Sequence, residues 1–556
     1  MYQSSHVCHS HGGKRLCKEE KCPSKDHGNG FCVSSVSFVK SSVSGVPSVA
    51  EWHVQAGRAT GLQAGVSSQC LGLSYVTFEF QFTTTARKSR WRAPGSSYRE
   101  RYACKAFLPE SVPDETLQEI LKLTQRSPSG FNTQSWVCIV LRTTEDRAAL
   151  ANAMIDANVR KVNEAPVVVV FAADCEPSKN VPRMQQLNRD NGAPDDFVNR
   201  IPALVEMFSG EHDPKVSTEA WAYKQATFAA ATFLYAAQVH GLATCPMEGF
   251  DQAGVKKVLN IPDRYSIPWW WRWVTPTPLP SQLSHRCAFS DRGMVLRSSS
   301  RLLRTATQTR CLSSAQKRLG ATIEERYACK AFLPTPVPDE TLKEILRLTL
   351  RAPTGFNVQP YACVLVREQK DREKLAEAMM DSNIRKVKEA PVVAVFAADL
   401  EPSKRIPRLQ KLAHDNGAPA DFVSNLPHVV RLFSGEGVVA SGLRAAIATA
   451  VSPLLPAPSN VSTEAWAFKQ ATFAAATFLY AAQAHGLATC PMEGFDQIRV
   501  RNALDIPDRY GVPVVIALGH ANPDALPEKP SVRLDPTEIF FDGKFGGSSE
   551  KIFSDK

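Results

Sequence analysis

Apolar residues in this chain gather into short uninterrupted runs and into one alanine-rich stretch. The run Val392–Phe396, VVAVF, has no polar face and predicts a buried strand. A second β-branched run, which ends at Gly519, predicts another strand. The alanine-rich stretch ends at His485 and Gly486, and glycine at this place is typical of a helix end. Because its apolar part, Ala471–Ala484, is shorter than the ~20 residues that a membrane helix needs, we expect a buried helix and no membrane span.

Most of the 556-residue sequence occurs twice. Residues 100–109 and 325–334 both read ERYACKAFLP, and the 35-residue blocks 218–252 and 463–497 differ at only two positions. This repeat is larger than the units of solenoid proteins, which reach roughly 50 residues. The repetition therefore indicates a duplicated domain, within a chain whose length allows about three or four domains.

The repeat boundaries and the composition between them divide the chain into segments. Residues 37–95 are rich in serine, valine and threonine without sustained periodicity, which predicts a disordered linker. The predicted segments are a Cys/His-rich segment (1–36), this linker (37–95), the first copy (96–268), a basic linker (269–320), the second copy (321–545) and a short C-terminal extension (546–556).

The two copies differ at their C-terminal ends. After IPDRYSIP the first copy reads WWWRWVTPTPLP, which has no strand alternation, whereas the second copy continues with the β-branched run. We therefore expect the first copy to be truncated and to lack its last strand. The second copy also carries an insertion, 437–460, where the first has only residues 212–215. The alanine and proline bias of this insertion predicts a loop excursion, or sequence that is not normally translated.

The bulk composition, 44% hydrophobic and 22% charged, is typical of a soluble globular protein. The formal net charge of +10 lies largely outside the repeats, so it does not indicate a nucleic-acid-binding face. Several of the 14 cysteines recur at matching positions of the two copies, which predicts reduced core thiols and a reducing compartment. These recurring pairs are Cys104/Cys329, Cys138/Cys363 and Cys245/Cys490.

The N-terminal segment has the donor atoms of a zinc site. Cys17, Cys22 and Cys32 lie in a run that resembles one imperfect unit of short zinc-finger-like repeats. Structural zinc needs four ligands, so Cys8 or His11 would have to complete the set. The alternative is a disordered tail.

Residues 294–323 have the composition of a mitochondrial transit peptide. They begin with Met294, contain six basic residues and no acidic one, and place arginines at helical spacing. Import signals are read from a free N-terminus. This mid-chain position therefore favours two joined gene copies, of which the second starts near Met294 and is directed to the mitochondrion. The alternative is a basic, flexible linker within one cytoplasmic chain.

Four polar motifs recur in the same order in both copies. Each alone is also what an ordinary helix start, turn, helix end or αβ loop contains. In the second copy they are RYACKAF (326–332), PTGFNVQP (353–360), NIRK (383–386) and TCPMEGFD (489–496). Together they resemble the FMN-dependent nitroreductase family, over about residues 97–268 and 321–543. No GxGxxG follows a strand, so a dinucleotide-binding Rossmann unit is not expected.

The resemblance implies a flavin phosphate held by cations. Arg326 would hold the phosphate, and Lys330 would lie near the phosphate and the ring, because such groups give charge-assisted hydrogen bonds to a phosphate dianion. Arg533, in an element found only in the second copy, would return to the same phosphate. Ala328 stands where the family often has serine, so one hydroxyl contact would be missing.

The resemblance also implies a site for the isoalloxazine ring. Asn383 and Lys386 would lie at the ring edge, where a fixed cation stabilises the negative charge of reduced flavin. Glu493 and Gly494 would lie over flavin N5, and the turn at 353–360 would reach the partner's flavin. In the second copy the expected cofactor-binding residues are Arg326, Tyr327, Ala328, Lys330, Pro353, Thr354, Gly355, Asn357, Asn383, Lys386, Pro491, Glu493, Gly494, Lys529 and Arg533. In the first copy they are Arg101, Lys105, Ser129, Asn132, Asn158, Lys161, Glu248 and Gly249.

We therefore expect two α+β domains, each with three α-β-α layers around a mainly antiparallel sheet of about five strands. The expected activity is ping-pong hydride transfer from NAD(P)H through FMN to a small-molecule acceptor, a quinone or a nitroaromatic, with no catalytic side chain. The two copies would form an intrachain pseudo-dimer, or the second copy would form a homodimer. Two alternatives remain open: a specialised flavoprotein, such as a dehalogenase or an oxidase, and a non-catalytic scaffold with decayed flavin sites.

Overall fold

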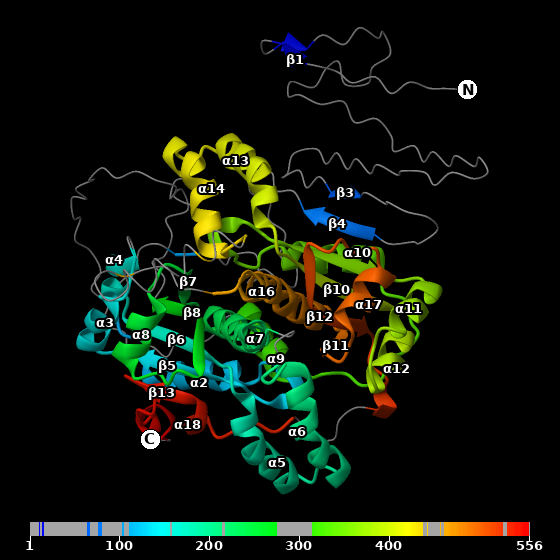
Figure 1. Cartoon of the computed structure of the whole chain (residues 1–556), viewed down its shortest axis with the longest axis horizontal. Coiled ribbons are helices and arrows are strands. Elements are labelled where there is room, and N and C mark those ends of the chain that lie inside the picture. Colours follow the sequence, from blue (N-terminus) through cyan, green and yellow to red (C-terminus); the bar gives the residue numbers. More distant parts are fainter. Residues whose placement is uncertain are drawn as a thin grey trace.

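The two alanine-rich stretches form long helices, α7 (Thr218–Val239) and α16 (Thr463–Ala484), which lie against each other at the centre of the computed structural model (Figure 1). Each helix begins after a serine whose hydroxyl accepts a backbone N–H of the first turn. Nearly all of their side chains are buried, because each helix packs against a sheet and against the other helix. Reciprocal hydrogen bonds join them, from Tyr235 to Thr477 (2.8 Å) and between Tyr480 and Thr232 (2.6 Å).

The structure describes residues 103–104, 110–155, 158–213, 217–274, 314–437, 442, 456, 461–525 and 531–554, and the backbone of four short strands nearer the N-terminus, β1 (Ser10–His11), β2 (Lys14–Arg15), β3 (Ala64–Val66) and β4 (Val76–Phe80). Several predictions concern residues outside these ranges. They are the zinc ligands Cys17, Cys22 and Cys32, the cofactor residues Arg101, Lys105 and Lys529, the transit-peptide-like residues 294–313 and most of the insertion 437–460.

The first copy builds a five-stranded sheet in the order β13-β5-β6-β8-β7, in which β13 (Phe540–Asp542) comes from the C-terminal end of the chain. Its own four strands are antiparallel, and the edge strand β13 pairs in parallel with β5. The helices and strands of this copy are α2 (Asp114–Gln125), β5 (Trp136–Leu141), α3 (Thr144–Ala151), α4 (Asn158–Glu164), β6 (Val167–Asp174), α5 (Val181–Asp190), α6 (Asp195–Ser209), α7, β7 (Ala243–Met247), α8 (Gln252–Leu259) and β8 (Tyr265–Val274).

The second copy repeats this order of elements and builds an antiparallel sheet, β11-β12-β10-β9-β4-β3. Its helices and strands are α9 (Ser314–Glu325), α10 (Asp339–Thr349), β9 (Tyr361–Val366), α11 (Gln369–Ala376), α12 (Ser382–Glu389), β10 (Val392–Asp399), α13 (Ile406–Asp415), α14 (Ala420–Ser434), α16, β11 (Ala488–Met492), α17 (Gln497–Ala503) and β12 (Tyr510–Gly519). Short 3-10 turns lie at Gly130–Asn132, Pro177–Asn180, Gly355–Asn357, Pro402–Arg405 and Pro523–Ala525.

Helices cover both faces of each sheet, which confirms the expected α+β fold with three layers. The outer face of the first sheet packs against α3, α4 and α8, and that of the second against α11, α12 and α17 (Figure 1). The inner faces of both sheets join α2, α7, α9, α10 and α16 in one hydrophobic core that runs through both copies. The copies therefore fold around a shared core. The helix pairs α5–α6 and α13–α14 project from opposite ends of the molecule (Figure 1).

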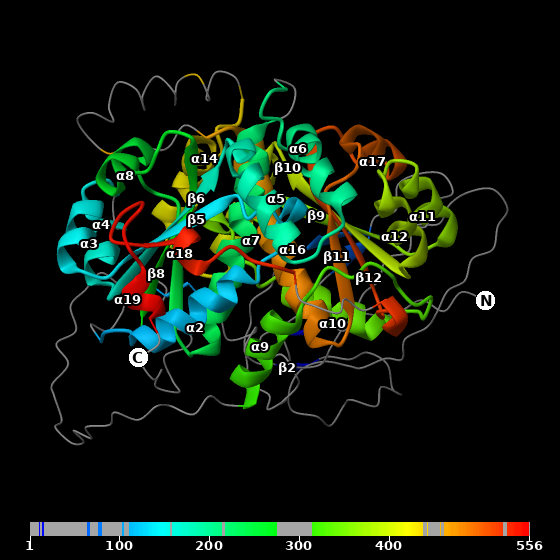
Figure 2. The same ribbon diagram turned by 90° about the horizontal axis from the view of Figure 1, so that it is seen from below.

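After β12 the chain leaves the second copy and crosses to the first. Residues 531–554, here called the tail, include α18 (Pro536–Ile539), β13 (Phe540–Asp542) and α19 (Glu550–Phe553). β13 adds to the edge of β5 with Phe540 opposite Cys138, and the tail lies beside α2 (Figure 2). The side chain of Phe540 is buried against Trp136. The C-terminal end of the second copy thus adds a strand and two short helices to the first copy.

Two sequence expectations about chain ends need correction. The first copy does have its last strand, β8, which pairs with β6 and β7. The missing alternation was no argument against it, because a central strand covered by helices on both faces has no polar side and because tryptophan favours strands. In addition, α9 begins at Ser314, inside the range predicted as a basic linker, and β3 and β4 lie within the range predicted as a disordered linker.

The recurring cysteines are buried, as expected of reduced core thiols. Burial raises the pKa of the Cys138 and Cys363 thiols well above the usual value. Within the described part of the chain, no helix combines the length and the apolar character that crossing a membrane requires.

Candidate active site

A cavity of about 840 Å³ lies between the two copies. The second copy contributes the segment around Arg326, the start of α12 and the loop 490–494. The first copy contributes the turn 128–132 and the helix pair α5–α6, and the tail closes one side with residues 531–533. Neither copy alone has all of these walls.

Arginine side chains line the deep end of this cavity. Arg326 is only 3% exposed, and its Nε and Nη1 have no hydrogen-bond partner among the described residues. Arg533 donates from Nη1 to Asn132 Oδ1 (2.9 Å) and from Nε to the carbonyl of Gln125 (2.7 Å). Burial, followed by repulsion from Arg126 and Arg326, lowers the pKa of Arg533 to about 9. Burial is also the main cause that lowers the pKa of Arg326. This end of the cavity is therefore built for an anion.

A buried ammonium group lies further along the cavity. Lys386 donates from Nζ to Asn383 Oδ1 (2.8 Å) and to Ser382 Oγ (3.1 Å). Burial is the main cause that lowers the pKa of Lys386, and the neighbouring cations Lys330 and Arg385 lower it further. The amide of Asn383 donates in turn to the carbonyl of Gly494 (3.2 Å), so helix α12 is joined to the loop 490–494.

Gly494 is required at its place by this close approach. A Cβ atom there would lie 2.8 Å from Asn383 Nδ2 and 3.7 Å from the ring of Phe208. Any larger residue would push α12 or α6 away from the loop. The glycine therefore keeps the cavity wall thin between the two copies.

The carboxylate of Glu493 is held by the central helix of the other copy. It accepts hydrogen bonds from Trp221 Nε1 (3.0 Å) and Gln225 Nε2 (2.8 Å), and Lys224 Nζ lies 3.3 Å away. The side-chain oxygen Oε1 of Gln225 accepts the backbone N–H of Gly130 (2.8 Å). A single glutamine thus connects the loop of the second copy to the turn of the first.

The turn of the first copy has an unusual backbone. Phe131, Asn132 and Gln134 all have positive φ, at 49°, 58° and 48°. Such values are uncommon for residues other than glycine and are found where function constrains the chain. The ring of Phe131 contacts that of Phe208 at 5.2 Å, so the turn and α6 form one wall of the cavity.

The structure brings together in this cavity eleven of the residues expected at a flavin. They are Arg326, Ala328, Lys330, Asn383, Lys386, Pro491, Glu493, Gly494 and Arg533 of the second copy with Ser129 and Asn132 of the first. Tyr327 is not among the lining residues. Pro353, Thr354, Gly355 and Asn357 lie in the corresponding turn of the second copy, close to Glu248 of the first, as the reciprocal arrangement requires.

The reciprocal location repeats the contacts that Asn383 and Lys386 make in the cavity. Asn158 Nδ2 donates to the carbonyl of Gly249 (3.0 Å), and Lys161 Nζ donates to Asn158 Oδ1 (2.8 Å). Glu248 accepts from Gln470 Nε2 (2.6 Å) and pairs with Lys469 (3.1 Å). What this location lacks is a second tail, because the KPSVRL element occurs once in the chain.

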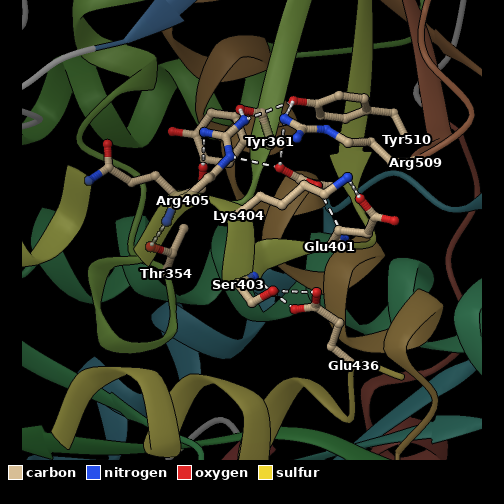
Figure 3. Close-up of polar contacts among 11 residues, drawn as sticks. Thr354, Tyr361, Glu401, Ser403, Lys404, Arg405, Glu436, Arg509 and Tyr510 are labelled. Atoms are coloured by element: carbon tan, nitrogen blue, oxygen red, sulfur yellow. Dashed lines mark hydrogen bonds and ion pairs between the residues drawn. The ribbon is translucent and has the colours of Figure 1, made fainter. Parts of the chain in front are cut away.

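The second copy has its own support where the tail supports the first. Arg405 donates to the carbonyls of Gln359 (2.9 Å) and Tyr361 (3.2 Å) and pairs with Asp399 (2.8 Å), directly behind the turn that contains Thr354 (Figure 3). Its counterpart in the first copy is Asn180, which lines a cavity of about 80 Å³ together with Leu534 and Ile539 of the tail. In the second copy the side chain of Arg405 thus lies where the tail lies in the first copy.

Several residues in and beside the cavity were not found from the sequence. Arg126 lies beside the cavity at the end of α2, where its carbonyl accepts hydrogen bonds from Arg326 and Arg533, and no local motif marks it. Phe197, Arg200, Leu204 and Phe208 lie on one face of α6, and none of them belongs to a recurring motif. Their helical spacing was a signal, but it is equally the signal of core packing.

Comparison with known proteins places the chain in a family. The profile of the nitroreductase family matches residues 98–268 and 323–520, which is more than half of the sequence. The chain belongs to the nitroreductase family, and it is an oxidoreductase.

Individual relatives match about one copy each. An NADH dehydrogenase from Thermus thermophilus is 32% identical over 203 residues, which cover 36% of this chain and 86% of the relative. A Streptomyces coelicolor protein, provisionally named an NADH dehydrogenase/NAD(P)H nitroreductase, is 31% identical over 212 residues, covering 38% and 89%. The crystal structure of a nitroreductase family protein from Streptococcus pneumoniae matches at 24% identity with a TM-score of 0.31, covering 39% of this chain and 96% of that one.

Proposed function

We propose that the chain is an FMN-dependent NAD(P)H oxidoreductase whose flavin lies in the cavity between the copies. The observation that carries this proposal is the buried guanidinium group of Arg326, which has two donor nitrogens without a partner among the described residues. A buried charge without compensation destabilises a protein. A bound anion would remove this cost, and the phosphate of FMN has the charge and the acceptor oxygens to do so.

The residues present would fit this cofactor along its length. Arg326 and Arg533 would donate to the phosphate, and Lys386 with Asn383 would lie at the ring edge. Asn132, on the turn of the first copy, would orient Arg533 through the hydrogen bond described above. When bound, FMN would supply the group that takes hydride from NAD(P)H and passes it to an acceptor.

The chain's own side chains would bind and orient the flavin and would exclude water from it. The Lys386 ammonium is fixed by two hydrogen bonds, so it would stabilise negative charge at the ring edge without reorganisation. Phe131 and Phe208 would shield the ring from solvent on the side of the first copy. The acceptor would be an electron-poor small molecule such as a quinone or a nitroaromatic.

The test is the absorbance spectrum of the purified full-length chain, followed by identification of the flavin released on denaturation. We expect bound FMN, together with oxidation of NADH or NADPH that depends on a quinone or a nitroaromatic. A colourless protein that does not take up added FMN would contradict the proposal and leave a scaffold. Bound FMN without NAD(P)H oxidation would instead point to a specialised flavoprotein of the same family.

A further inference from the structure

Arg200 is the one cation of the described cavity lining that no part of a flavin would need. The lining contains five cationic side chains, Arg200, Arg326, Lys330, Lys386 and Arg533. In the proposed function, on which this inference rests, the last four serve the phosphate and the ring. Arg200 differs from them in its surroundings, since its side chain is 60% exposed whereas Arg326 is buried.

Arg200 bridges the two copies at the mouth of the cavity. Its Nη2 lies 2.9 Å from Asp381 Oδ2, and Asp381 is itself 66% exposed. Asp381 precedes α12, the helix that carries Asn383 and Lys386. It has a positive φ of 48°, and its carboxylate does not cap the helix. The pair therefore joins α6 of the first copy to the ring-edge helix of the second.

This ion pair can open easily. Exposed ion pairs contribute only about 0.2–1 kcal/mol, because water screens them and because two long side chains must be ordered. An anionic group on an incoming molecule offers Arg200 a bidentate partner of at least equal strength. Such a group would displace Asp381 at little cost.

The other copy shows that the fold does not require this charge. Helix α14 repeats the apolar positions of α6, with Phe422 and Phe433 in place of Phe197 and Phe208. Phe433 contacts Phe356 at 5.1 Å, as Phe208 contacts Phe131. At the position of Arg200, however, the second copy has Asn425. The arginine is thus specific to the helix that covers the cavity completed by the tail.

We propose that Arg200 is a specificity-determining residue that binds an anionic group of the molecule entering this cavity, in exchange for Asp381. The shared chemistry is a phosphate or carboxylate at the end remote from the reacting atoms. Its two possible sources are the 2′-phosphate of NADPH, for which arginine is the usual partner, and an acid group on the acceptor.

The test compares matched charged and neutral ligands on the flavin-loaded full-length chain. The probes are NADP⁺ against NAD⁺ and 4-nitrobenzoate against 4-nitrobenzamide, with dissociation constants from titration calorimetry. Arg200→Asn introduces the residue of the other copy, so the helix should tolerate it. We expect it to reduce the preference for the charged member of one pair by about tenfold, which is the loss of one charge-assisted contact. Loss in the first pair identifies the nucleotide phosphate, and loss in the second identifies an acidic acceptor.

A second variant should change the preference for the charged ligand in the opposite direction. Asp381→Asn removes the competing carboxylate and keeps a residue that tolerates positive φ, so the same preference should increase. If neither variant changes either preference, or if both change it in the same direction, the proposal is overturned and the pair is only structural. Flavin content is measured on the same samples. A wild-type protein without flavin would contradict the proposed function, which this readout keeps separate from the role of Arg200.

Discussion

Glu493 serves both copies at once. It lies in the loop that lines the cavity from the second copy, yet its carboxylate is bound by Trp221, Lys224 and Gln225 of the first. Both members of the Lys224–Glu493 pair are buried. The motif resemblance put Glu493 beside the flavin, and its side chain contacts the other copy. Its effect on the cavity is therefore to fix the backbone of the loop, and it is a positioning residue.

The change Glu493→Gln tests this role. It leaves Lys224 without its buried counter-ion, which should cost about 3 kcal/mol of unfolding free energy, measured by urea denaturation. We also expect FMN affinity to fall, because an amide has only one acceptor oxygen and cannot accept both the Trp221 and the Gln225 N–H groups that now hold the loop. The matched control is Glu248→Gln, which breaks the equivalent Lys469–Glu248 pair. If both variants lose equal unfolding free energy and equal affinity for FMN, the loss of FMN affinity is not specific to the loop that contains Glu493.

Arg533 gives a pH-dependent prediction. Its pKa falls well below the usual value, to about 9, in the folded chain, so its charged form is disfavoured by folding. This penalty is fully present below pH 9 and is relieved as the pH rises above 9. An anion removes the same penalty. The increase in melting temperature on adding FMN should therefore be larger at pH 7.5 than at pH 9.5, in thermal scans with and without FMN. An increase that does not depend on pH would contradict the assigned pKa.

At the residue scale, the sequence could predict those groups that belong to local motifs. Arg326, Lys386 and Gly494 were found because their neighbours in the chain carry the pattern. Arg126 and Arg200 were not found, because Arg126 contacts Arg533 and Arg200 lines the cavity only when the first copy packs against the second. Their own neighbours carry no information about that approach.

The tail is the element that makes the two copies unequal. It crosses from the second copy to the first, adds a strand to β5 and returns Arg533 to the cavity. Gln125 of the first copy donates to the carbonyl of Leu534, whereas its counterpart in the second copy is Leu350, which has no polar side chain. The receiving surface is thus adapted to the tail in one copy only.

Removal of residues 526–556 should both destabilise the chain and abolish FMN binding. Leu534, Ile539, Phe540 and Ile552 are buried in the shared core, and each contributes about 1.5–3 kcal/mol. The measurements are melting temperature and flavin content. Arg183→Gln is the control, since it breaks only an exposed ion pair between the first copy and Glu538 of the tail, and should cost less than about 1 kcal/mol. A truncated chain that keeps its flavin would show that Arg533 is dispensable.

Sequence patterns predicted most elements, and one failure is instructive. The runs ending in Phe396 and Gly519 and the alanine-rich helices appear as expected, because buried elements need only apolar residues of suitable length. The strand β8 was not predicted because its sequence lacks the alternation of apolar and polar residues that we took as the sign of a strand. A strand that lies between two others and between two helical layers has no exposed side, so it need not alternate. Its formation depends on the strands that it pairs with, and the local sequence does not identify them.

At the scale of the whole molecule, duplication has produced two related locations and one complete cavity wall. The hydrogen bonds of Asn383 and Lys386 are repeated by Asn158 and Lys161. The tail with Arg533 is not repeated, since its sequence element occurs only after the second copy. In its place the second copy supports its turn with Arg405, which binds Asp399 and the carbonyl of Gln359 (Figure 3).

This asymmetry predicts one flavin per chain, in the cavity that contains Arg326 and Arg533. Arg326→Gln should abolish flavin binding, whereas Arg101→Gln, at the matching motif position of the first copy, should leave one flavin bound. Because Arg326→Gln removes a buried charge of which two nitrogens have no hydrogen-bond partner among the described residues, the variant should remain folded, which circular dichroism checks. The measurement is flavin per chain after denaturation, with the protein quantified by amino-acid analysis. Two flavins in the wild type would mean that the reciprocal location holds a phosphate without a tail. Loss of flavin in Arg101→Gln alone would mean that the roles of the two copies are the reverse of those argued from the tail.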